Sequence, residues 1–157
     1  MTTAKQFFER VRDASRDAER IRTQLVAMEH RAQSLGGCGF EPRVRSAPDP
    51  QRMERRVDVY MDREIALKDR MEDDYRLIDK GCMVIYGNDE HRGLDKVVSP
   101  VWADILWWKY LDDAKMVSVA DVVGYSPRTC SFMCTQALAW IDEHRFMSAV
   151  IDSIDDG

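Results

Sequence analysis

The chain has 157 residues, of which 45% are hydrophobic and 32% charged, and its formal net charge is −5. Eight Gly and five Pro are too few for a disordered or turn-rich β protein, and no apolar run approaches the roughly 20 residues of a membrane-spanning helix. Since the charged N-terminus also lacks a signal-peptide core, we expect a folded, helical, cytoplasmic protein.

The charge is unevenly distributed along the chain. Residues 1–98 contain 19 basic and 19 acidic residues, whereas residues 99–157 contain four basic and nine acidic residues. Modules that bind nucleic acids usually carry a basic face. The charge balance of the last third therefore gives no support for nucleic-acid binding.

The sequence does not indicate metal, cofactor or enzyme chemistry. Cys38, Cys82, Cys130 and Cys134 form no CxxC pair, and only His144 lies near the last two as a further zinc ligand. There is no nucleophile with a partnered base, no Gly-rich phosphate loop and no evident carboxylate pair. We expect reduced thiols, no metal, no cofactor and no catalytic activity.

The first 35 residues carry a narrow apolar stripe. Its members alternate at spacings of four and three, a period of 3.5 that is typical of a coiled-coil seam. They are Phe7, Val11, Ala14, Ala18, Ile21, Leu25, Met28, Ala32 and Leu35. Thr2 or Thr3 is expected to cap this helix, and Gly36-Gly37 to end it.

A second long helix is expected after a loop. Residues 36–50 are rich in Gly and Pro, and Asp49-Pro50 provides an N-cap and a first helical residue. The second seam comprises Met53, Val57, Tyr60, Glu64, Leu67, Met71, Tyr75, Ile78, Cys82 and Ile85. Two such helices predict an antiparallel hairpin. Its many arginines predict a solvated surface, with phosphate contacts as the alternative.

Residues 87–98 are polar and predict a linker, after which Ser99-Pro100 begins another helix. That helix contains three tryptophans and is apolar around much of its circumference, so it is expected to be buried. A turn at residues 112–115 follows it.

Residues 117–141 have the pattern of a helix-turn-helix. Val119 and Ala120 mark the inner face of a short helix, Gly124 permits a corner with positive φ, and Ser126-Pro127 begins a second helix. The expected inward positions of this helix are Cys130, Met133, Ala137, Leu138 and Ile141. The expected outward positions near its start are Pro127, Arg128, Ser131, Phe132 and Thr135.

We therefore predict an all-α fold, with a long antiparallel helical hairpin (coiled coil) followed by a compact helix-turn-helix domain. The predicted ranges are a hairpin over 1–86 with a loop at 36–50, a linker over 87–98, and a helix-turn-helix domain with a C-terminal helix over 99–157.

The stretch from Ile105 to Ile141 resembles region four of sigma factors, which reads the upstream promoter element. The matching features are Tyr110-Leu111-Asp112, Val119-Ala120, Gly124-Tyr125-Ser126 and Ala137-Leu138. A charged hairpin followed by this module also resembles the phage-encoded transcriptional regulators of the RinA/ArpU type. The arrangement of the predicted helices is similar over most of the chain, whereas the sequence motifs are similar only in its last third.

The resemblance implies a phage or prophage transcriptional regulator of the late-gene activator type, located in the cytoplasm of the bacterial host. Such a regulator would read double-stranded promoter DNA with helix 127–141 and act with host RNA polymerase. The implied DNA contacts are Ser126, Pro127, Arg128, Ser131, Phe132 and Thr135. Because affinity for DNA comes mainly from phosphate neutralisation, Lys115 is added to this set and a homo-oligomer is expected.

Two other functions stay open. A small terminase subunit also joins a helix-turn-helix to oligomerising helices, and it would form a closed ring. A protein-interaction module would use the same shape to bind a protein, and the acidic last third favours this alternative.

Overall fold

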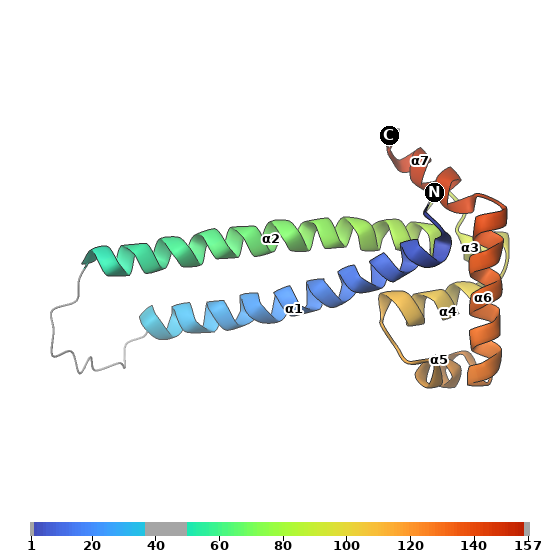
Figure 1. Ribbon diagram of the computed structural model, residues 1–157, viewed down its shortest axis with the longest axis horizontal. Helices are drawn as coiled ribbons and strands as arrows, with labels where there is room; N and C mark the ends of the chain where they lie inside the picture. The colour runs from blue at the N-terminus through green and yellow to red at the C-terminus, as the bar shows by residue number, and fades with distance from the viewer. Residues whose placement is uncertain (1, 37–49, 156–157) are drawn as a thin grey trace. The chain divides into compact units, whose positions relative to one another are not determined.

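The computed structural model describes residues 2–36 and 50–155, and this part of the chain is all-α, as predicted (Figure 1). The helices are α1 (Ala4–Gly36), α2 (Pro50–Tyr86), α3 (Leu94–Val97), α4 (Pro100–Leu106), α5 (Met116–Val123), α6 (Pro127–Glu143) and α7 (Phe146–Asp155), and a π-helical segment η1 (Trp107–Leu111) continues α4. None of the described helices is long and apolar enough to cross a membrane. The predicted loop interior, with the Asp49 cap, lies outside the described residues.

The chain divides into two compact units. Unit 1 comprises residues 1–16 and 74–157, and unit 2 comprises residues 17–73, so that α1 and α2 contribute to both. This division differs from the predicted ranges, which assigned the whole of both helices to one hairpin. The reason is that the first turns of α1 and the last turns of α2 share one core with the helices that follow.

Unit 1 has a continuous hydrophobic core. Thr3 and Gln6 form a capping box at the start of α1: the Thr3 hydroxyl accepts from the Gln6 N–H at 3.3 Å, and the Gln6 side chain accepts from the Thr3 N–H at 3.1 Å. The largest fully buried side chains of this core are Tyr110, Phe8, Ile85, Leu94, Ile105, Leu106, Ile141, Val11, Val84 and Val119. The tryptophans of α4 and η1 are half-buried and pack against it.

The segment predicted as a polar linker is folded into unit 1. It contains α3, and Leu94 is completely buried. Gly87 has a φ of 68°, and the Asn88 side chain accepts from the N–H groups of Glu90 and His91, which closes a tight turn. Residues 87–98 are therefore a structured connection, and the polar composition concealed one core residue.

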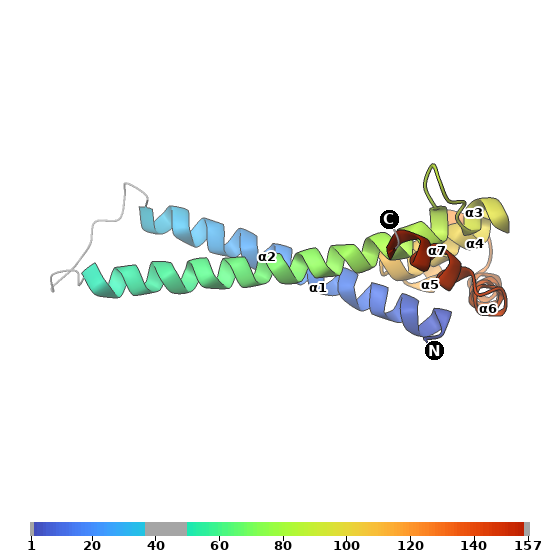
Figure 2. The same ribbon diagram turned by 90° about the horizontal axis from the view of Figure 1, so that it is seen from above.

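Unit 2 contains the remaining parts of α1 and α2. The two helices run antiparallel, and their ribbons separate toward Gly36 and Pro50 in both views (Figures 1 and 2). Asp17 is buried and accepts hydrogen bonds from Arg70 Nη2 at 2.8 Å and Arg20 Nη2 at 3.1 Å. The other buried residues in the described part of this unit are Ala18, Ile21 and Leu67.

The predicted coiled-coil seam is confirmed at Ala18, Ile21 and Leu67, and it is wrong at positions farther along the two helices. Ala32 is exposed, as are Val57 and Tyr60 on α2. These exposed positions lie in the parts of α1 and α2 whose ribbons separate (Figures 1 and 2). The spacing of the stripe is regular, but the packing is not.

Candidate nucleic-acid interface

The corner between α5 and α6 has the geometry that its residues predict. Gly124 ends α5 in the left-handed region with a φ of 86°. Ser126 is the N-cap of α6, and its hydroxyl accepts from the Thr129 N–H at 3.2 Å. Pro127 is the first helical residue, where its missing N–H costs nothing. The helix-turn-helix prediction is thus confirmed at the level of local structure.

The inner face of α6 packs against α4 and α5. Four of the five predicted inward residues are buried, and Met133 is half-buried. Cys134, which was not assigned to this face, is also buried, and burial raises the pKa of its thiol. In the described part of the chain, no group of three or more His, Cys, Asp or Glu is arranged to hold a metal ion.

Most of the residues that were predicted to contact DNA lie on the outer face of α6, whereas Ser126 is its N-cap and Lys115 precedes α5. The seven side chains Lys115, Ser126, Pro127, Arg128, Ser131, Phe132 and Thr135 are all exposed. Arg128, Phe132 and Thr135 are spaced by four and three residues, so they follow one line along the helix. Phe132 is 62% exposed, a large value for an aromatic side chain. The structure thus brings these residues onto an accessible surface.

Two of the predicted hydroxyl groups already make local hydrogen bonds. The Ser126 oxygen serves as the cap and also lies 2.8 Å from the Thr129 hydroxyl. Thr135 donates its hydroxyl proton to the Ser131 carbonyl at 3.1 Å, which leaves its oxygen lone pairs and methyl group to face outward. Ser126 therefore positions α6, whereas Thr135 retains an acceptor and an apolar contact.

Several exposed residues of α5, the corner and α6 were missed at the sequence level. Gln136 and Tyr125 are exposed, and so are Val117 and Val122 on α5. The signal for Gln136 was its position eight residues after Arg128, which places it beside the same line. Nothing local distinguishes exposed valines from core valines in a short apolar helix.

This surface carries few charged residues. Between Pro127 and Ile141, α6 carries Arg128 and no acidic residue; Asp142 and Glu143 follow at its C-terminal end. Lys115 precedes α5, and the exposed Asp121 lies on it. An anionic ligand would therefore meet the N-terminal half of α6, away from the two terminal carboxylates.

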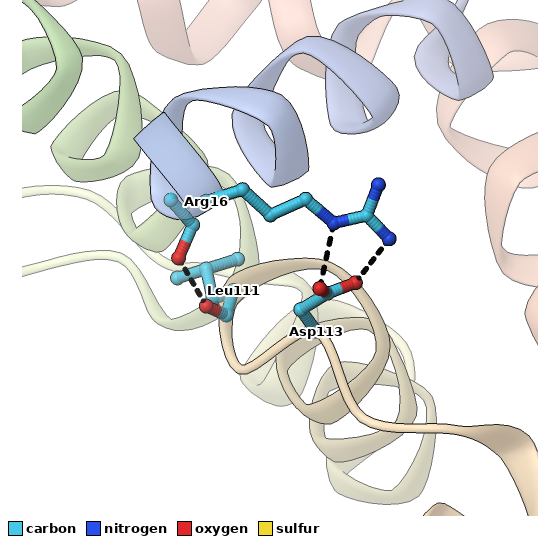
Figure 3. Close-up of polar contacts among 4 residues, drawn as sticks. Arg16, Leu111 and Asp113 are labelled. Atoms are coloured by element: carbon cyan, nitrogen blue, oxygen red, sulfur yellow. Dashed lines mark hydrogen bonds and ion pairs between the residues drawn. The ribbon is translucent and has the colours of Figure 1, made fainter. Parts of the chain in front are cut away.

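The turn that precedes α5 is held by the first turns of α1 (Figure 3). The Ser15 hydroxyl donates to the Leu111 carbonyl at 2.6 Å, and the Arg16 guanidinium donates to both Asp113 oxygens at 2.6 and 2.8 Å. The hydrogen bond and charge of Arg16 lower the pKa of Asp113. At the other end of α6, Asp142 accepts from the Ala4 N–H at 2.7 Å. The helix-turn-helix is thus attached to α1 at two places.

No protein-family model, curated protein or solved structure matches this chain. The residues and geometry described above are therefore the basis for any functional assignment.

Proposed function

We propose that this chain is a DNA-binding transcriptional regulator, of the phage late-gene type that its sequence resembles. The observation that carries the proposal is the line of Arg128, Phe132 and Thr135 on the exposed face of a helix whose other face is buried. A helix presented in this way by a helix-turn-helix fits the major groove.

The side chains on this face have suitable chemistry for reading base edges. A guanidinium such as that of Arg128 pairs with guanine, and an amide such as that of Gln136 pairs with adenine. Phe132 and the Thr135 methyl group provide apolar surface of the kind that contacts the C5-methyl group of thymine. These contacts confer specificity, whereas the affinity requires additional positive charge.

The low charge of this surface supports a requirement for partners. Lys115 and Arg128 are the two exposed basic residues between positions 115 and 143, and the whole chain has a net charge of −5. We therefore propose weak binding of double-stranded promoter DNA by one chain. A homo-oligomer, and host RNA polymerase bound beside it, would supply the missing phosphate contacts.

Selection from a random duplex library, followed by fluorescence anisotropy on the enriched sequence, tests this function. Arg128→Ala should weaken specific binding by about 1–3 kcal/mol, or roughly five- to 150-fold. Arg92→Ala removes the same charge from an exposed site outside the helix-turn-helix and should have little effect. If no sequence is enriched, with or without polymerase, the proposed function fails.

A protein-binding role is the second candidate, because four large apolar side chains are exposed on α5, the corner and α6. Their exposed fractions are 64% for Val117, 56% for Val122, 44% for Tyr125 and 62% for Phe132. Exposed apolar side chains of this size are typical of protein contacts when charge is scarce. Partner binding that survives Arg128→Ala and Lys115→Ala but is lost in Phe132→Ala would select this role.

A further inference from the structure

Unit 2 exposes an apolar stripe on α2. Val57, Met61 and Ile65 are spaced by four residues and therefore lie on one face of the helix. Their exposed fractions are 54%, 55% and 57%. Three neighbouring aliphatic side chains that are each more than half exposed are an unusual surface for a helix rich in charged residues.

The same unit has little core of its own. No side chain described between Gln51 and Ala66 is buried, and among the described side chains of α1 the last buried one is Ile21. Helices draw most of their stability in water from a packed apolar face. The part of α2 between Gln51 and Ala66 thus has an exposed apolar face, and a second element packed on that face would stabilise it.

The charged residues at the ends of the stripe show which partner fits. Glu54 and Lys68 lie seven residues before and seven residues after Met61, so all three share one face of α2. A second α2 packed antiparallel about a two-fold axis at Met61 places Glu54 opposite the partner's Lys68 and Val57 opposite the partner's Ile65. Parallel packing would instead place each of these charges opposite its own copy.

We propose that a second copy of this chain packs on the stripe, with the two α2 helices antiparallel and Met61 at the two-fold axis. The interface is self-complementary, as a two-fold interface requires. Lys68 binds Glu64 of its own chain at 2.7 Å. Both groups are about half exposed, and an exposed ion pair of this kind contributes little to stability. Lys68 is therefore available to pair with Glu54 of the second copy.

This inference specifies the surface for the proposed homo-oligomer and rests on that part of the proposed function. It does not depend on DNA binding, because unit 2 contains none of the residues proposed to contact DNA. Failure of self-association and failure of DNA recognition are therefore measured separately.

Sedimentation of the full chain over about 1–100 μM tests the interface. A dimer is expected, and Met61→Glu should weaken it at least tenfold by burying two unpaired carboxylates. Glu54→Lys and Lys68→Glu should each weaken it several-fold, and the double variant should regain the wild-type constant because the ion pairs are restored in reverse. Parallel pairing predicts no such recovery.

Arg63→Glu is the matched control for Lys68→Glu, since it also replaces a basic residue by an acidic one, at an exposed position of α2 away from the stripe. Circular dichroism verifies that every variant keeps its helix content. A chain that stays monomeric at all concentrations would overturn the inference, and a different protein would then be the candidate to bind the stripe. A dimer that tolerates Met61→Glu would also overturn it, since association would then use another surface.

Discussion

Unit 1 and unit 2 share the helices α1 and α2, yet only unit 1, which adds the helices that follow them, has a substantial core. In unit 1, Phe8 and Val11 of α1 are fully buried: the Phe8 ring packs on Tyr110 of η1, and the Val11 side chain lies against Gly81 of α2. In unit 2, α1 continues with the same heptad spacing, but the described residues of the stripe after Ile21 are half-buried or exposed. A regular stripe is thus buried only where further elements pack against it.

The difference also appears in how each unit uses polar residues. Unit 2 places a carboxylate, Asp17, among its few buried positions and pairs it with Arg70 at 2.6 Å. In unit 1 the bidentate ion pair of Arg16 and Asp113 lies at the surface and attaches a turn to a helix. One unit thus has a buried carboxylate paired with an exposed arginine, whereas the other has a surface ion pair beside a large apolar core.

Gly87→Ala should have the largest effect on unit 1. A Cβ at this position would lie 2.1 Å from the His91 carbonyl oxygen and 2.4 Å from the Gly93 nitrogen, and φ is 68°. Since backbone atoms cannot move aside cheaply, we expect a loss of about 3 kcal/mol or more in the free energy of unfolding, measured by urea denaturation.

Gly124→Ala is the matched control for this prediction. Gly124 has a comparable φ of 86°, but nothing lies within 4 Å of an added Cβ. The cost should therefore be limited to backbone strain, about 1–2 kcal/mol. Equal losses for the two variants would show that the turn at Gly87 is not closed as described.

Leu94→Ala and Leu67→Ala compare the two cores directly. Leu94 is fully buried in unit 1, and its truncation should cost about 2–5 kcal/mol because the surrounding side chains cannot fill the cavity. Leu67 is 3% exposed, but the residues on both sides of it in the chain are exposed. Its truncation should therefore lower the free energy of unfolding by less than about 2 kcal/mol. Thermal unfolding followed by circular dichroism measures both. A larger loss for Leu67 would contradict the contrast between the units.

Asp113→Asn should have the smallest effect, and that effect should depend on pH. The pKa of Asp113 is below its ordinary value of 3.8 because Arg16 stabilises the carboxylate. The folded state therefore gains stability above pH 3.8, and this gain is lost as the pH falls below that value through the folded-state pKa. The melting temperatures of the wild type and the variant should converge as the pH falls below the folded-state pKa of Asp113. A constant difference would assign the effect to the turn conformation, in which Asp113 has a φ of 56°.

The sequence alone was sufficient for features that depend on neighbouring residues in the chain. Helix boundaries followed from caps and breakers, as at Thr3, Ser126-Pro127 and Gly124. The two faces of α6 followed from its apolar periodicity, so the exposed line through Arg128, Phe132 and Thr135 was predictable. Each of these features is determined within one or two helical turns.

Only the tertiary structure decided which of the apolar residues are buried. Leu94 occupies a polar segment and yet lies in the core, whereas Val57 belongs to a regular stripe and yet is exposed. Val117 and Val122 are exposed on α5, whereas Val119 on the same helix is buried. Burial depends on which element lies opposite a side chain, and that element comes from a distant part of the chain. The spacing of residues along one helix therefore specifies a face, and packing in three dimensions determines whether that face is covered.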